Sequence, residues 1–313
     1  MPESKLFKEI AALRTEKINP ESKKIDESSV REILKIINEE DKKVPEAIEK
    51  CLPEIENAVN LVVAAFKSNG RLIYTGAGTS GRLGILDAAE CPPTFGSDPD
   101  MVQGLIAGGR EAVFVAQEGA EDDPQNGVID IERTGVKPPD VVCGIAASGR
   151  TPYVKGALNE AKRKGCKTII VTTSTKKHIE ELEINADVVI DPDVGPEVIA
   201  GSTRMKSGTA QKLILNMITT TAMVRIGKTL GNVMIDLQLT NSKLGERAKR
   251  TIMDFTGVNY STAENVLNEA GGSVKTALVM ILGDVDQKKA HELLKKSDGF
   301  VRKALKFANV EIN

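Results

Sequence analysis

Short apolar segments alternate with segments of helical character between residues 71 and 192, and this alternation constrains the fold more than any other feature of the chain. Strands are predicted at 71–75, 102–108, 140–147, 167–174 and 186–192. Short apolar strands separated by helices are typical of a parallel sheet that is covered by helices on both faces. The sequence therefore predicts an α/β fold built on a doubly wound parallel sheet.

The helices predicted around this sheet divide the chain into three parts. Residues 1–30 are polar and are predicted to form an extended arm. Helices are predicted at 28–41, at 44–70 with a break or kink at Pro53, at 82–90 before Pro92-Pro93, at 152–165 and at 207–228. After about residue 240 only short helices are predicted. We expect an N-terminal arm and helix at 1–50, a sheet domain at 51–240 and a small all-helical domain at 241–313.

Composition excludes several classes of partner. Lys and Arg number 42 against 44 Asp and Glu, so the net charge of −2 gives no broad basic face for nucleic acid. Two histidines, and four cysteines without a CxxC spacing, predict no metal site. No apolar run approaches the roughly 20 residues that span a bilayer, and the charged N-terminus does not resemble a signal peptide. We expect a cytoplasmic protein with no membrane or nucleic-acid partner.

Two loops that combine glycine with hydroxyl side chains connect predicted strands to predicted helices. They are Gly76-Ala77-Gly78-Thr79-Ser80-Gly81 and Ser148-Gly149-Arg150-Thr151. The carboxyl edge of a parallel sheet is where ligands bind, and N–H groups at helix N-termini attract anions. The loops therefore predict a site for a phosphate monoester, with helix caps and tight turns as the simpler interpretation.

The first loop also fits the G-x-G-x-x-G pattern of dinucleotide sites. That pattern requires an acidic residue about 20 residues further on. Here the first acidic residue after the second predicted strand is Glu111, about 33 residues after Gly78. The dinucleotide interpretation is therefore the weaker one.

Glu90 and Glu121 are the candidates for proton transfer. Each follows one of the predicted strands, so both can face one pocket at the carboxyl edge of the sheet. Two carboxylates in different environments can serve as acid and base, and the sequence offers no positioned histidine for this work. A solvated acidic turn is the alternative for both residues.

The segment GAGTSGRLGILDAAECPPTFG, at residues 76–96, resembles the signature of the N-acetylmuramic acid 6-phosphate etherases. These are enzymes with a sugar-isomerase (SIS) domain. Further matching segments are NEEDKKVP, GLIAGG, EGAEDD, GIAASGRTPYV and GSTRMKSGTAQKLILNM. The resemblance runs from about residue 18 to the C-terminus. It implies a flavodoxin-like three-layer SIS fold with a small C-terminal domain that resembles a ubiquitin-associated (UBA) fold.

The resemblance also implies a reaction and roles for residues. The family removes D-lactate from N-acetylmuramic acid 6-phosphate without a cofactor and leaves N-acetylglucosamine 6-phosphate. Glu121 is then the base at C2 of the open-chain sugar, and Glu90 is the acid that protonates the departing lactate. The phosphate is expected to be held by Gly78, Thr79, Ser80, Ser148, Gly149 and Arg150.

Some points stay open within this resemblance. Arg204 and Lys206 are candidates for binding the lactate carboxylate, or else surface charges at a helix start. SIS enzymes usually form dimers, so a homodimer is expected. An aldose–ketose isomerase, and a non-catalytic sugar-phosphate sensor similar to the glucokinase regulatory protein, are the alternative functions.

Overall fold

The computed structural model describes residues 13–237, 239 and 242–311, so residues 1–12 of the predicted arm lie outside the described residues. The chain forms two compact units. The first comprises Met1–Ala88 and Asp100–Thr219, and the second comprises Ala89–Pro99 and Thr220–Asn313. The predicted boundaries after residues 50 and 240 stay predictions.

A five-stranded sheet forms the centre of the first unit. Its strands are β1 (Leu72–Gly76), β2 (Val102–Ile106), β3 (Val141–Ile145), β4 (Lys167–Val171) and β5 (Val188–Ile190). All pairs are parallel and the order is β2-β1-β3-β4-β5, which confirms the predicted doubly wound, flavodoxin-like sheet. The strand order reverses between β1 and β3, so the switch point of the sheet lies there.

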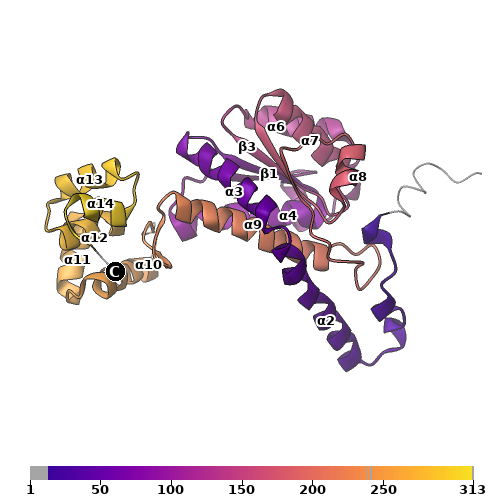
Figure 1. The fold of residues 1–313 in the computed structure, drawn as a ribbon, viewed down its shortest axis with the longest axis horizontal. Helices are drawn as coiled ribbons and strands as arrows, with labels where there is room; N and C mark the ends of the chain where they lie inside the picture. Colours follow the sequence, from indigo (N-terminus) through magenta and orange to yellow (C-terminus); the bar gives the residue numbers. More distant parts are fainter. Residues whose placement is uncertain (1–12, 238, 240–241, 312–313) are drawn as a thin grey trace, which may run out of the picture. The chain divides into compact units, whose positions relative to one another are not determined.

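Helices cover both faces of this sheet (Figure 1). One face carries α6 (Pro124–Thr134) and α7 (Pro152–Arg163), and the other carries α3 (Leu52–Lys67), α4 (Gly78–Phe95) and α9 (Lys206–Arg225). Buried side chains of strands and α7, among them Ile73, Val142, Val154 and Leu158, form one apolar cluster. The remaining short helices are α5 (Glu111–Phe114), the 3₁₀ helix η4 (Glu118–Glu121) and α8 (Lys176–Glu181).

Helix α2 (Val30–Glu49) runs through Pro45, where the sequence predicted the start of a second helix. An internal proline removes one hydrogen bond and costs about 3 kcal/mol. Val44 and Ile48 beside it are fully buried, and this packing offsets the cost. The actual break falls at Lys50 and Cys51, and Pro53 lies in the first turn of α3, where proline is tolerated.

Helix α4 likewise passes through Pro92 and Pro93, so the prediction that it ends before them was wrong. Cys91 and Phe95, on either side of the prolines, are buried. Burial of these side chains stabilises the helical path where local preference would end it.

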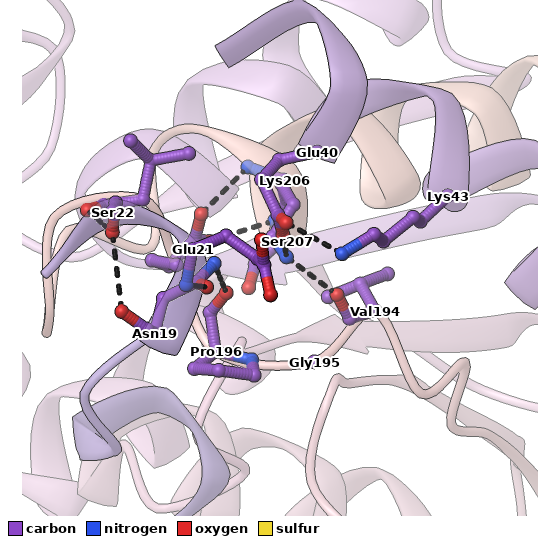
Figure 2. A network of polar contacts seen from close by, with 12 residues as sticks. Asn19, Glu21, Ser22, Glu40, Lys43, Val194, Gly195, Pro196, Lys206 and Ser207 are labelled. Atoms are coloured by element: carbon purple, nitrogen blue, oxygen red, sulfur yellow. Dashed lines mark hydrogen bonds and ion pairs between the residues drawn. The ribbon is translucent and has the colours of Figure 1, made fainter. Parts of the chain in front are cut away.

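The described part of the N-terminal arm is packed and is not extended as predicted. It forms three short 3₁₀ helices, η1 (Arg14–Glu16), η2 (Pro20–Ser22) and η3 (Ile25–Glu27). Asn19 Nδ2 donates to Pro196 O at 3.1 Å (Figure 2). Ser22 Oγ donates to Val198 O at 2.6 Å. The backbone carbonyls of Pro196 and Val198 thus accept hydrogen bonds from side chains that are far away in the sequence.

The second unit contains the predicted C-terminal helices. They are α10 (Ser242–Thr256), α11 (Tyr260–Glu269), α12 (Val274–Gly283), α13 (Gln287–Lys296) and α14 (Val301–Phe307). A small hairpin of β6 (Thr229–Leu230) and β7 (Val233–Met234) precedes them. Their apolar side chains form a separate core. The UBA-like arrangement stays a prediction. Within the described residues, no helix combines the length and the apolar character needed to cross a membrane.

Candidate active site

The two predicted anion-binding loops leave neighbouring strands at the switch point of the sheet. β1 and β3 are paired in register, with Gly76 opposite Ile145 at their carboxyl ends. The first loop leads directly into α4, whose first three residues are Gly78, Thr79 and Ser80. The second loop leads into α7, which begins at Pro152. The structure therefore places both loops at the sheet edge where ligands bind in folds of this kind.

The second loop is built around a glycine that no other residue could replace without strain. Gly149 has a φ of +72°, and a Cβ atom on it would lie 2.3 Å from Cδ1 of Ile179. The tight turn lets the backbone N–H of Arg150 donate to Ser148 Oγ at 3.3 Å. Ser148 and Arg150 are both partly exposed, so their side chains can reach a ligand.

A cavity of about 360 Å³ lies beside this loop. Its walls are Ser148, Arg150, Thr151 and Pro152 from the loop and α7, Glu121 and Asp122 from the end of η4, and Leu13 and Glu16 from the arm. The structure thus brings the predicted base, Glu121, into one cavity with two of the predicted phosphate ligands. An arginine and hydroxyl groups can donate hydrogen bonds to a phosphate, and a carboxylate beside them can transfer a proton.

The first loop contributes none of the described residues that line this cavity. Gly78 is exposed and Thr79 is partly buried. Ser80 is only 9% exposed, and its hydroxyl donates to Gln211 Oε1 of α9 at 2.9 Å. The backbone N–H groups of a first helical turn have no partner within their helix, and they remain the natural anion donors of this loop.

The two predicted proton-transfer groups belong to different units. Glu121 lies in the first unit and faces the cavity. Glu90 is exposed on the second half of α4, in the stretch that belongs to the second unit. The pairing of Glu90 with Glu121 stays a prediction.

Lys206 is neither a surface charge nor open to a ligand. It is fully buried, and its Nζ donates to Glu40 Oε2 at 2.6 Å and to Val194 O at 2.8 Å (Figure 2). Burial raises the pKa of the Glu40 carboxyl, but hydrogen bonds from Lys206 and Lys43 outweigh burial and lower this pKa to about 2. The idea that Lys206 binds lactate was therefore wrong. Arg204 is exposed at the start of the same segment.

The start of α9 is held at several points around this ion pair. The buried Glu197 carboxylate accepts the backbone N–H groups of Lys206 and Ser207, each at 2.9 Å. Ser207 Oγ lies 3.0 Å from the Oγ1 of Thr173, which is the second residue after β4. The first turn of α9 is thereby tied to the end of the sheet.

Further along, a buried carboxylate joins α9 to α4. Asp87 accepts hydrogen bonds from Tyr74 Oη at 2.9 Å, Asn216 Nδ2 at 2.7 Å and Thr219 Oγ1 at 3.2 Å. Burial raises the pKa of Asp87, and these three hydrogen bonds act in the opposite direction. Asp87 therefore holds the helix that carries the first loop against its neighbours.

Sequence reasoning missed four residues at or next to these loops, namely Leu13, Glu16, Thr151 and Gln211. Thr151 could have been included as the last residue of the second loop. The other three have no local signal, because long-range packing alone brings the arm to the cavity and α9 to Ser80.

Known proteins resemble this chain over nearly its whole length. An N-acetylmuramic acid 6-phosphate etherase of Salinibacter ruber is 59% identical, with 97% of this chain and 98% of that protein covered. One of Caldanaerobacter subterraneus subsp. tengcongensis is 52% identical, with 95% and 96% covered. Among solved structures, a phosphoheptose isomerase from Neisseria gonorrhoeae is 18% identical with a TM-score of 0.46, covering 62% of this chain and 98% of that one.

A match to a domain family agrees with the fold. Residues 54–162 match the family described as the glucokinase regulatory protein N-terminal SIS domain. These residues contain β1, β2 and β3 together with both loops. Identity of 59% across nearly the full length is decisive, and the chain belongs to the family of N-acetylmuramic acid 6-phosphate etherases.

Proposed function

We propose that this protein cleaves the D-lactyl ether of N-acetylmuramic acid 6-phosphate, and that Glu121, Ser148 and Arg150 act on the substrate in the cavity beside β3. The products are N-acetylglucosamine 6-phosphate and D-lactate, so the enzyme is a carbon–oxygen lyase. The observation that carries the assignment of residues is the cavity shared by a carboxylate, an arginine and a hydroxyl at the switch point of the sheet.

The reaction needs two proton transfers and a set of hydrogen-bond donors that bind the phosphate. The aldehyde at C1 of the open-chain sugar acidifies the C2 proton, which Glu121 removes. The C3–O bond then breaks, its electrons go to the ether oxygen, and Glu90 supplies the proton for departing lactate. Water adds to the double bond between C2 and C3, which returns a proton to C2 and places a hydroxyl on C3. General acid–base catalysis of this kind contributes about 10²–10⁴-fold to a rate.

The phosphate is held by hydrogen bonds from the two loops in this proposal. Gly78, Thr79 and Ser80 offer the free N–H groups of the first turn of α4. Ser148, Gly149 and Arg150 offer a hydroxyl, a tight backbone turn and a guanidinium group. Neutral donors and one cation suit a ligand that must be released after each turnover.

The full-length relatives do not favour the two alternative functions. An isomerase would share the phosphate loops and the base at C2, but it would not release lactate. A sensor would bind the sugar phosphate without converting it. The curated relatives that cover nearly the whole chain are etherases.

We also propose that the protein acts in the cytoplasm as a homodimer. Phe114 is 78% exposed and Val115 is 59% exposed, just before the 3₁₀ helix that ends at Glu121. A contiguous exposed apolar patch can mark a protein–protein interface, and these two neighbours are candidates for its centre. Analytical ultracentrifugation of the protein, and of a variant with Phe114→Ser and Val115→Ser, tests this: the wild type should sediment as a dimer and the variant as a monomer.

The decisive test of the activity is incubation with N-acetylmuramic acid 6-phosphate and an assay for D-lactate. Lactate and N-acetylglucosamine 6-phosphate should form in equal amounts. Formation of a ketose without lactate would support the isomerase, and binding without conversion would support the sensor.

The roles of the two glutamates are separated by a second readout, the exchange of the C2 hydrogen in deuterated water. Glu121→Gln should stop both exchange and lactate release, because the base starts the reaction. Glu90→Gln should lower lactate release by about 10² or more while exchange continues, because the base is untouched. The opposite asymmetry would exchange the two roles, and full lactate release by either variant would remove that glutamate from the mechanism.

A further inference from the structure

The hydroxyl of Ser80 is committed to another residue in this structure. Ser80 Oγ donates to Gln211 Oε1 at 2.9 Å. A serine hydroxyl carries one hydrogen, so the same group cannot also donate to a phosphate on the first loop. If Ser80 binds the phosphate as proposed above, its hydrogen must first be released from Gln211.

Gln211 can release that hydrogen without moving its backbone. Its side chain is 1% exposed, and its Nε2 group is buried with no hydrogen-bond partner among the residues that the structure describes. A buried amide nitrogen without an acceptor is costly, and such a group in a native structure calls for an explanation. An amide group has nearly the same shape after a half turn about its last bond, which exchanges oxygen and nitrogen.

The half turn would reverse the hydrogen bond between the two side chains. With Nε2 toward Ser80, Gln211 donates to Ser80 Oγ, and the Ser80 hydrogen is free to point at an anion. A negative ligand on the loop favours this arrangement, because it accepts the released hydrogen in a charge-assisted bond. Without the ligand, the arrangement seen here leaves Ser80 bound to the amide oxygen.

The backbone that carries Gln211 is held in place. Glu197 caps the first turn of α9, and the buried pair of Lys206 and Glu40 fixes its first residue (Figure 2). A Cβ atom on Gly208 would lie 3.4 Å from the Thr79 methyl group, so the first turn of α9 is close to the first loop. Rotation of the Gln211 amide is therefore the simplest adjustment between α9 and Ser80.

We infer that Gln211 is a positioning residue that turns its amide nitrogen to Ser80 and thereby makes the Ser80 hydroxyl a donor to the substrate phosphate. This inference rests on the proposed function, because it requires the first loop to hold the phosphate. The competing explanation is that Gln211 only ties α9 to α4. The two explanations differ in whether the effect of Gln211 on binding depends on Ser80 and on the phosphate.

The experiment is a double-variant cycle of Gln211→Met and Ser80→Ala, with binding of N-acetylglucosamine 6-phosphate and of N-acetylglucosamine measured by calorimetry. Methionine has about the size of glutamine but can neither donate nor accept in this way. Gln211→Met should weaken binding of the phosphorylated sugar by roughly 3-fold to 10-fold, because the Ser80 hydroxyl is then no longer oriented toward the phosphate and this hydrogen bond is lost or weakened. In the Ser80→Ala background, Gln211→Met should cause no further loss of affinity for the phosphorylated sugar. Its effect on binding of the unphosphorylated sugar should be absent in both backgrounds.

Asn216→Leu is the matched control. Asn216 is also a side-chain amide of α9, and its hydrogen bond among the described residues goes to Asp87 of α4 and not to the first loop. The Asn216→Leu variant should bind the phosphorylated sugar as tightly as the wild type, even if its melting temperature falls as far as that of the Gln211→Met variant. The inference would be overturned if Gln211→Met weakened binding equally with serine or alanine at position 80, or equally for both sugars. It would also be overturned if Asn216→Leu weakened binding as much as Gln211→Met. Unchanged binding in Ser80→Ala alone would instead refute the Ser80 hydroxyl as a ligand of the phosphate.

Discussion

Replacing Lys206 with methionine should destabilise the first unit more than any loss of a surface charge. Lys206 is 1% exposed and Glu40 is 3% exposed, and their 2.6 Å contact joins α2 to α9 across 166 residues of sequence. In Lys206→Met the Glu40 carboxylate keeps Lys43, a side chain that is 54% exposed, and a hydrogen bond from the neutral Asn19. A buried charge would then have lost its buried partner.

The size of the effect follows from this burial. Removing one partner of a buried ion pair costs about 3–5 kcal/mol. For a unit of about 200 residues, that loss lowers the melting temperature by about 6–20 °C. The lowered pKa of Glu40, about 2 against an ordinary 4.5, indicates a similar stabilisation of about 3 kcal/mol.

The same pKa sets the pH dependence. Because the pKa of Glu40 is lowered on folding, its contribution is fully present above about pH 4.5 and is lost as the pH falls toward 2. The wild type should therefore lose stability in this range. Lys206→Met should show less of this loss, because it lacks most of the contribution from the start.

Thermal unfolding followed by circular dichroism at pH 7.5 and across pH 2–5 is the assay. The double variant Glu40→Leu/Lys206→Met should recover most of the stability, because apolar pairs often replace buried ion pairs without loss. Lys42→Met is the control, since Lys42 forms an exposed pair with Glu39 that is worth less than about 1 kcal/mol. If Lys206→Met shifted the melting temperature no more than Lys42→Met, the reasoning about burial would be refuted.

Two further changes test the second loop and its backbone. Ser148→Ala removes a donor to a charged group and should raise KM by roughly 10-fold to 150-fold in a lactate-release assay; an unchanged KM would exclude Ser148 as a phosphate ligand. Gly149→Ala should cost about 1–3 kcal/mol in urea unfolding, because alanine disfavours a φ of +72° and would contact Ile179. Gly245→Ala, in α10 with open space around it, should instead stabilise by about 0.5–1 kcal/mol, and an equal effect of both alanines would contradict this account.

The sheet could be predicted from the sequence because strand and helix signals are local. Apolar runs of about five residues, ended by glycine and hydroxyl residues, mark β1 and β3 and the loops that follow them. Parallel pairing then places both loops at one edge, which is why a ligand site could be predicted there from the alternation of strands and helices. The family, and with it the reaction, could likewise be inferred from the segment at 76–96.

Only the tertiary structure decided which distant residues meet. Lys206 looked like a surface charge, because nothing near it in the sequence indicates that Glu40 will be buried against it. Pro92 and Pro93 looked like a helix end, because local preference takes no account of the burial of Cys91 and Phe95. Nothing in the local sequence of Gln211 predicts its hydrogen bond with Ser80, because the two residues are 131 positions apart and meet only in the folded chain. Local sequence determines elements and turns, whereas burial and partners depend on the path of the whole chain.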